Sequence, residues 1–291
     1  MTTRATADPI VQRLSALVQD SPDLRDAARI YEAILPLLRD ADLRNGPVPI
    51  TSEEARRKLE TGLPLLAGLD LEFDLAGLRE FMLQLIRCVE TAGCGAGGNT
   101  RAAGAVLLRA AIEEGGLDVS GLLSRVAAGE KDAVRSMAES LGLEPDLAWT
   151  LGQNTLKPLL HTWRRQVMPL TEGVPWHRGS CLICGADATL GELRGDTQSK
   201  YLRCGQCGAD WAFHRLRCAH CGNEDHHTLG FLYMESNRER VRVEVCEECH
   251  GYLKVISSFS PTPPEMLAVE DLATLHLDYI AQQRGYTAVI R

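Results

Sequence analysis

Apolar residues between positions 8 and about 170 recur with the spacing of amphipathic helices. The first such stripe is made by Ile10, Val11, Leu14, Leu17 and Val18, at i, i+1, i+4, i+7 and i+8. The pattern therefore predicts a helical N-terminal domain over residues 1–172. Its further helices are expected around residues 24–38, 75–86, 105–112, 122–126, 133–141 and 145–163.

Local signals set the expected ends of several of these helices. Ser21-Pro22-Asp23 is typical of a helix start, with serine as N-cap and proline at the first helical position. Thr51 and Glu54 have the spacing of a capping box, and Pro36 is expected to kink its helix. The glycine-rich residues 93–98 interrupt the pattern. No Gly-Lys-Ser/Thr follows them and no strand precedes them, so they indicate a flexible connection rather than a phosphate loop.

Beyond residue 172 the apolar period shortens to that of β-strands. Val241, Val243 and Val245 alternate with Arg242 and Glu244, as in a strand with one covered face. The order of a hairpin followed by a third strand occurs twice, so we predict two successive modules, residues 173–213 and 214–260. A proline-rich linker at 260–264 then precedes a helix over 265–284, within a last segment of residues 261–291.

Each module contains two Cys-x-x-Cys pairs, and this pattern carries the chemistry of the chain. A Cys-x-x-Cys turn directs two sulfurs to one point, and two such turns enclose a tetrahedral metal ion. The alternatives are a disulfide cluster or buried small apolar residues, but four pairs in under seventy residues favour metal binding. The candidate ligands are Cys181, Cys184, Cys204, Cys207, Cys218, Cys221, Cys246 and Cys249.

The internal repeat also indicates how the pairs combine. It favours two sequential sites, Cys181/Cys184 with Cys204/Cys207 and Cys218/Cys221 with Cys246/Cys249, over an interleaved cross-brace. His220 and His250 stand next to these cysteines, but each site already has four sulfurs, so neither is expected to be a ligand. The adjacent His226 and His227 are expected to face solvent, whereas Cys88, on an apolar helix face, and the separate Cys94 lie apart from the cysteine pattern.

Composition and charge narrow the function further. The chain has 291 residues and a formal net charge of −8, and the cysteine-rich region shows no basic face, so nucleic-acid binding is disfavoured. The first residues lack the apolar core of a signal peptide, and no apolar run approaches the length of a membrane helix. We therefore expect a cytoplasmic protein without membrane insertion, whose cysteines hold metal rather than disulfides. No catalytic constellation occurs at an informative spacing, so no enzyme activity and no catalytic residues are predicted.

The residues of the cysteine-rich region resemble the formate dehydrogenase accessory protein family, FdhE. The resemblance covers roughly the last 110 residues, and it depends on Cys-x-x-Cys motifs in a specific sequence context. The matching stretches are Cys181-Leu-Ile-Cys-Gly, Tyr201-Leu-Arg-Cys-Gly-Gln-Cys, Trp211-Ala-Phe-His-Arg-Leu-Arg-Cys-Ala-His-Cys, Cys246-Glu-Glu-Cys-His-Gly-Tyr-Leu-Lys, and Asp271-Leu-Ala-Thr-Leu-His-Leu-Asp with Gly285-Tyr.

The resemblance implies an α+β multidomain fold: a helical N-terminal domain, two tandem rubredoxin-like/zinc-ribbon four-cysteine metal modules and a C-terminal helix. It implies two metal ions, iron rather than zinc, held by all eight cysteines. It also implies a cytoplasmic maturation factor that binds the catalytic subunit of formate dehydrogenase before twin-arginine export. From the residues alone zinc is equally suitable, no oligomeric state is indicated, and two other functions stay open: a zinc-ribbon nucleic-acid-binding protein and a rubredoxin-like electron carrier.

Overall fold

A computed structural model of the chain describes residues 8–92, 100–235, 237 and 239–288. The contacts divide the chain into two units. The first comprises residues up to Asn45 together with Phe73–Leu159, and the second comprises Gly46–Glu72 together with residues from Leu160 onwards. Residues 46–72 and 160–172 thus group with the cysteine modules, whereas the sequence placed them in a helical domain. The sequence-based boundaries at 172, 213 and 260 stay a prediction about independent folding.

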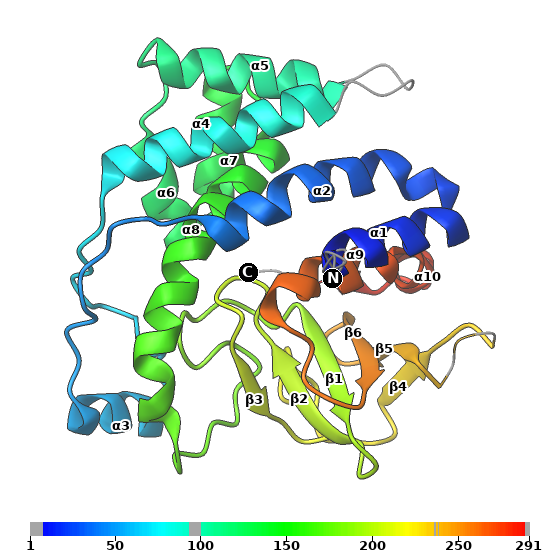
Figure 1. Ribbon diagram of the computed structural model, residues 1–291. Helices are drawn as coiled ribbons and strands as arrows, with labels where there is room; N and C mark the ends of the chain where they lie inside the picture. The colour runs from blue at the N-terminus through cyan, green and yellow to red at the C-terminus, as the bar shows by residue number, and fades with distance from the viewer. Residues whose placement is uncertain (1–7, 93–99, 236, 238, 289–291) are drawn as a thin grey trace, which may run out of the picture. The chain divides into compact units, whose positions relative to one another are not determined.

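The first unit consists of helices, as the apolar period predicts. Its core is made of leucine, isoleucine and methionine side chains that are fully buried, among them Leu14, Leu78, Met82 and Ile86. Helices α4 and α5 lie side by side in Figure 1 and share many contacts. The helices are α1 (Pro9–Asp20), α2 (Arg25–Asp40), α4 (Leu75–Ala92), α5 (Thr100–Glu113), α6 (Val119–Ala128), α7 (Lys131–Ser140) and the first part of α8 (Pro145–Val167).

Of the two predicted N-cap residues, Ser21 and Thr51, one makes the expected side-chain hydrogen bond and the other does not. A 3₁₀ turn over Pro22–Leu24 precedes α2, and Ser21 makes no side-chain cap bond there. Thr51 does cap α3 (Ser52–Glu60), because its hydroxyl accepts a hydrogen bond from the Glu54 amide at 3.2 Å. Cys88 is half-buried on α4, whereas Cys94 and the glycine-rich residues 93–98 lie outside the described residues.

The second unit contains a seven-stranded sheet. Six strands follow the order β3-β2-β1-β6-β5-β4 (Figure 1), and β7 pairs with β6. Each module supplies an antiparallel hairpin and a third strand, which matches the predicted repeat. The two modules are joined by a parallel pairing of β1 with β6, which the sequence did not indicate. The strands are β1 (Leu190–Arg194), β2 (Ser199–Arg203), β3 (Asp210–Ala212), β4 (Leu229–Leu232), β5 (Val241–Cys246), β6 (Gly251–Ser258) and β7 (Thr287–Ala288).

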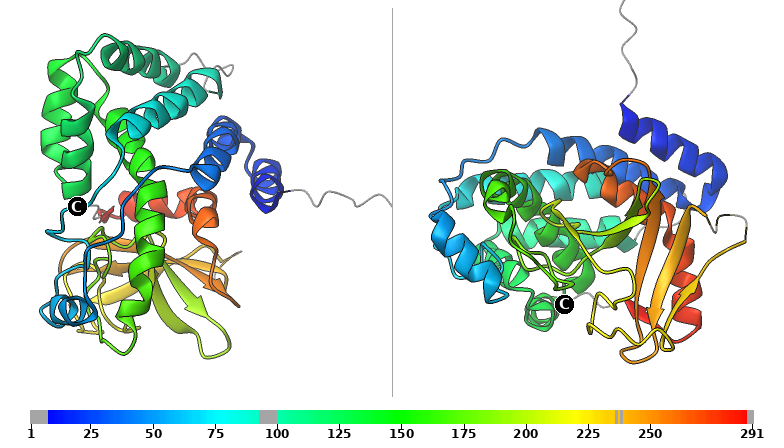
Figure 2. Two further views of the ribbon diagram at one scale, coloured as in Figure 1. Left: turned by 60° about the vertical axis from the view of Figure 1, so that its left-hand side comes forward. Right: turned by 90° about the horizontal axis from the view of Figure 1, so that it is seen from below.

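Helix α10 (Leu275–Gln283) covers one face of this sheet. The alternating valines of β5 pack there against Leu277 and Ala281, which are fully buried. Figure 2 shows the red helix beside the orange strands. The C-terminal helix is not continuous: α9 (Leu267–Ala273) ends before Thr274, whose hydroxyl donates to the Glu270 and Asp271 carbonyls.

The segment Gly46–Glu72 joins the second unit through main-chain hydrogen bonds. The amides of Leu65 and Leu66 donate to the carbonyls of Leu182 and Ile183, both at 2.9 Å, inside the first cysteine turn. Backbone bonds of this kind leave no side-chain pattern in the sequence. None of the described helices has the length and apolar character needed to cross a bilayer.

Candidate metal centres

The four Cys-x-x-Cys turns share one backbone geometry. In three of them the residue after the second cysteine is glycine with positive φ: Gly185, Gly208 and Gly222, at +82°, +74° and +76°. The amide of each donates to the carbonyl of the first cysteine of its pair, at 3.0–3.1 Å, which closes the turn. Glycine adopts this left-handed conformation without steric cost. In the fourth turn His250 has φ +51° instead.

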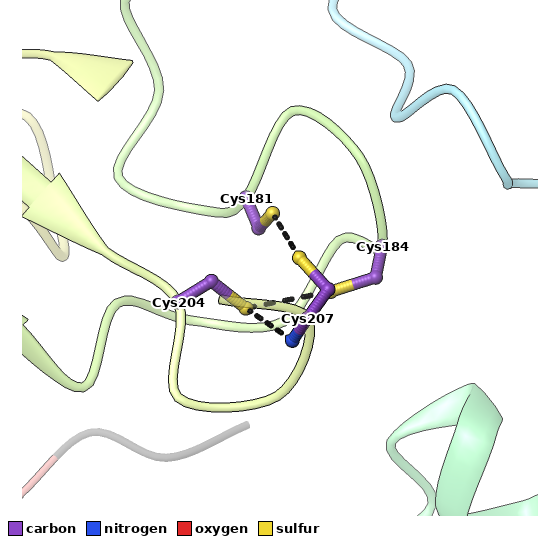
Figure 3. A group of neighbouring side chains, drawn as sticks. All are labelled: Cys181, Cys184, Cys204 and Cys207. Atoms are coloured by element: carbon purple, nitrogen blue, oxygen red, sulfur yellow. Dashed lines mark hydrogen bonds between the residues drawn. The ribbon is translucent and has the colours of Figure 1, made fainter. Parts of the chain in front are cut away.

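The turns bring the eight cysteines together in two groups (Figure 3 shows the first). Cys181 and Cys184 precede β1, and Cys204 and Cys207 lie between β2 and β3. Cys218 and Cys221 precede β4. Cys246 is the last residue of β5, and Cys249 lies between β5 and β6. The groups are sequential, as the internal repeat predicts, and not interleaved.

The distances between sulfurs fit a tetrahedral ion. Within each group all the sulfurs lie within 4.8 Å of one another. The Sγ–Sγ distances are 3.5 Å for Cys181–Cys207 and for Cys184–Cys204. They are 3.7 Å for the corresponding pairs of the second group. A metal–sulfur bond of about 2.3 Å gives a tetrahedron edge of about 3.8 Å, whereas a disulfide needs about 2.05 Å. The described cysteines are free thiols.

Backbone and side-chain donors also point at the sulfurs. The amides of Ile183, Cys207 and His220 lie 3.4 Å from the Sγ atoms of Cys181, Cys204 and Cys218 respectively. In the second group the Asn223 amide nitrogen adds a donor 3.6 Å from the Cys246 sulfur. Donors directed at sulfur stabilise the thiolate, which is the form that binds metal.

Close packing of four thiols separates their pKa values. Hydrogen bonds from Cys181, Cys184 and Cys207 lower the pKa of Cys204, whereas hydrogen bonding with Cys181 and Cys204 raises the pKa of Cys184. Burial raises the pKa of Cys246, but hydrogen bonds from the Cys249 amide and Asn223 outweigh it and bring the value to about 7. A bound cation would favour the deprotonated form of all four sulfurs in each group.

The two groups differ in exposure. In the first group Cys181, Cys204 and Cys207 are fully buried, and Cys184 is half-buried. In the second group Cys221 is exposed and Cys249 is half-buried. The first site therefore lies inside the fold, whereas the second opens to solvent.

The histidines near the cysteines make contacts of several kinds. The His220 Nε2 atom lies 2.9 Å from the Tyr252 carbonyl, so it bonds to the backbone of β6. The His250 carbonyl accepts from the Thr287 amide of β7 at 2.8 Å. His226 and His227 are exposed, and with Asp225 they form a third group of potential metal donors.

Sequence reasoning missed a buried ionic cluster beside the first group. Glu192 of β1 is fully buried and accepts hydrogen bonds from Arg194, from Arg203 at 2.8 Å and from the Thr262 amide at 2.9 Å. Arg194 also pairs with Asp210 of β3. The cluster joins three strands of the first module to the linker that follows β6. The only sign in the sequence is a glutamate within a short apolar strand pattern.

A partly buried ion pair links the modules. Lys200 of β2 forms an ion pair with Glu244 of β5, and both strands belong to the same sheet. With the parallel β1–β6 pairing, this contact makes the two four-cysteine modules one structural unit. The arrangement is suited to holding two tetrahedral metal ions at fixed positions on a rigid sheet.

The sequence of this chain is similar to those of several known proteins. Residues 216–289, which include the second cysteine group, match the family described as FdhE, C-terminal domain. A protein FdhE homolog of Aquifex aeolicus is 27% identical over 195 residues, covering 64% of this chain and 66% of the relative. A protein FdhE homolog of Stutzerimonas stutzeri is 36% identical over 109 residues, covering 36% and 35%. The matches thus span about two thirds of the first relative and about a third of the second.

The likeness extends to a solved structure. The crystal structure of the FdhE protein from Pseudomonas aeruginosa superposes with a TM-score of 0.61 at 24% identity, covering 97% of this chain and 92% of that one. At this identity the match establishes the fold alone.

Proposed function

Because residues 216–289 match the FdhE C-terminal domain, we propose that the chain is a member of the FdhE family. We propose that it is a maturation factor for formate dehydrogenase that binds the catalytic subunit of that enzyme in the cytoplasm before export. The observation that carries the proposal is the second four-cysteine group, which lies inside the part of the chain that matches the FdhE C-terminal domain. We further propose that each group holds one metal ion. The ligands are Cys181, Cys184, Cys204 and Cys207 in the first site, and Cys218, Cys221, Cys246 and Cys249 in the second.

The proposed role is binding rather than turnover of formate. Four sulfurs that all coordinate one ion leave none as a nucleophile. The sheet that carries the sites is stiffened by buried ion pairs, so it presents a fixed surface to a partner. Either zinc or iron fills a tetrahedron of thiolates, and iron adds a one-electron couple.

Electron transfer is the second candidate, because Cys221 is exposed at the second site. An ion near the surface can exchange electrons with a docked protein. Nucleic-acid binding has no such support, because Arg194, Arg203, Lys200 and Lys254 of the sheet are paired with carboxylates. Those cations are not available for phosphates.

Deleting the gene in a strain that respires formate tests the proposal. We expect formate dehydrogenase activity to be lost and to return when purified protein is added to the extract. Rescue by both zinc-loaded and iron-loaded protein is the result expected for binding, and rescue by iron alone would assign electron transfer. Full activity in the deletion strain would contradict the maturation role.

Affinity capture identifies the protein that the chain binds. The tagged chain should retain the catalytic subunit of formate dehydrogenase from cells respiring formate, and a Cys218→Ser/Cys221→Ser variant should retain less. A Cys88→Ser variant is the matched control, because that thiol lies apart from both groups. Equal capture by all three proteins would show that the second site does not shape the docking surface.

A further inference from the structure

The loop between Cys221 and β4 brings two imidazoles and a carboxylate together at the surface. Asp225, His226 and His227 are all exposed, and one donor atom of each lies within 4.8 Å of the others. The loop is tightly folded: Asp225 Oδ1 accepts from the His227 amide, and the Asp225 carbonyl accepts from the Thr228 amide, both at 3.0 Å. Three consecutive side chains are therefore held close to one another instead of diverging.

The two imidazole rings are unusually close for exposed side chains, with centroids 3.9 Å apart. Because both rings are exposed, contact between them buries little apolar surface and contributes little free energy. Two positively charged imidazoles at this distance would also repel each other. A shared transition-metal ion explains the arrangement, since neutral imidazole and carboxylate are its usual ligands. Bonds of about 2.0–2.2 Å to nitrogen and oxygen need donors about 3 Å apart, which small rotations of exposed side chains can provide.

The loop is also connected to the second cysteine group. Asn223 accepts from the Asp225 amide at 3.0 Å, and its own amide nitrogen lies 3.6 Å from the Cys246 sulfur. One side chain thus touches both the histidine loop and a candidate thiolate ligand. The exposed thiol of this group, Cys221, lies on the same segment.

We propose that Asp225, His226 and His227 form a surface site for a divalent transition-metal ion, and that this site supplies the ion to the second four-cysteine group. Transfer runs from three harder donors to four thiolates, which bind such ions more tightly. The supply step rests on the proposed function, in that the second group must itself hold metal. In the described residues no comparable group of histidines and carboxylates accompanies the first cysteine group.

Cobalt binding to the zinc-filled protein tests the surface site. Equilibrium dialysis of the full chain, with zinc in both cysteine groups, should show an additional Co²⁺ ion with the weak visible absorption of nitrogen and oxygen ligands. The His226→Gln/His227→Gln variant should lose that ion. A His177→Gln/His214→Gln variant is the matched control, because its two rings are also neighbours, at 5.7 Å, but belong to no group of three donors. Equal cobalt binding by the first variant and the wild type would overturn the site.

The rate of zinc replacement tests the supply step. Cadmium is softer than zinc and displaces it from thiolates, and its entry into a cysteine group shifts the nearby amide resonances. The His220 amide reports the second group, and the Ile183 amide reports the first. In the His226→Gln/His227→Gln variant we expect the His220 shift to develop about tenfold more slowly, with the Ile183 signal unchanged. Unchanged rates at His220 would overturn the supply step. If metal analysis of the purified chain finds zinc in neither cysteine group while cobalt still binds at the surface, the proposed metal ligation fails instead, and the surface site stands.

Discussion

Glu192 has no exposed surface, and its carboxylate is surrounded by the two arginines of its own hairpin and the Thr262 amide. Removing one partner of a buried ion pair leaves the other charge buried without a counter-charge. The loss of folding free energy is then larger than the net stabilisation that the intact pair provided. Glu192→Gln should therefore lower the free energy of unfolding by about 3–5 kcal/mol. Urea unfolding followed by tryptophan fluorescence measures the change.

The matched control is Glu60→Gln, which removes an exposed ion pair with Arg56. An exposed pair of this kind contributes about 0.5 kcal/mol or less. Equal losses in the two variants would mean that the buried cluster is no more important to stability than a surface pair.

The same carboxylate predicts a dependence on pH. Burial raises the pKa of Glu192, but hydrogen bonds from Thr262 and Arg203 outweigh it, so the folded-state pKa lies below its ordinary value. A depressed folded-state pKa stabilises the protein above the unfolded-state pKa, about 4.3. This contribution is lost as pH falls through the folded-state value. Stability of the wild type should fall below about pH 4 more steeply than that of Glu192→Gln.

Residue-level signals predicted the cysteine groups better than their surroundings. A Cys-x-x-Cys spacing predicts that the two sulfurs lie close together, because the turn that brings them together involves only four consecutive residues. The positive φ of His250 was hidden, since histidine replaces the glycine present in the other three turns. The Glu192 cluster was hidden because its partners come from several strands, and no local spacing brings them together.

At the level of elements, the period-two apolar patterns predicted the hairpins. They did not predict that the two modules would pair into one sheet. Pairing of β1 with β6 depends on backbone groups whose strands are far apart in sequence. Parallel pairing needs such a long connection. The helix break at Thr274 was also missed, because the apolar spacing continues across it.

The joined sheet changes the expected result of removing the first metal site. Cys204→Ser/Cys207→Ser leaves two of the four ligands, and a metal site that organises its loops contributes directly to folding. Protection of β1 and β2 amides from hydrogen exchange should fall by several kcal/mol. The loss should reach β6, because β6 bonds to β1.

Helix α4 serves as the internal reference for this measurement. Its buried face is formed by apolar residues of the first unit, such as Phe81 and Leu85. Its protection should stay within error of the wild type. Undisturbed exchange in β6 together with loss in β1 would show that the two modules unfold independently despite their shared sheet.

At the level of the whole molecule, the two units depend on different interactions. The first unit is built on apolar helix faces, and the second carries all eight candidate ligands. Treatment with a strong chelator should therefore lower the thermal transition of the second unit and leave that of the first in place. Calorimetry with and without chelator measures both transitions.

Readdition of zinc is the control, and it should restore the original profile. Coincident loss of both transitions would show that the units fold as one cooperative body. An unchanged profile after metal analysis shows complete removal would mean that the ions do not hold the sheet together.

The grouping of residues 46–72 with the second unit shows the limit of sequence reasoning at this scale. The apolar period of α3 predicts a helix and its cap, but not the unit to which it belongs. The main-chain bonds from Leu65 and Leu66 to the first cysteine turn contribute to that assignment, and they leave no side-chain pattern in the sequence. Local patterns determine elements, and their assignment to units depends on contacts between distant backbones.

The parallel pairing of β1 and β6 also has a consequence for synthesis on the ribosome. The first cysteine group is complete as soon as Cys207 has left the exit tunnel, so it can take its ion while the chain is still growing. One edge of β1 then stays open until Val255–Ser258 has been translated. Open strand edges pair readily with other chains. A nascent chain that stalls between the two modules would therefore expose a metal-bearing hairpin with an unsatisfied edge, and aggregation during overexpression is expected to begin at β1.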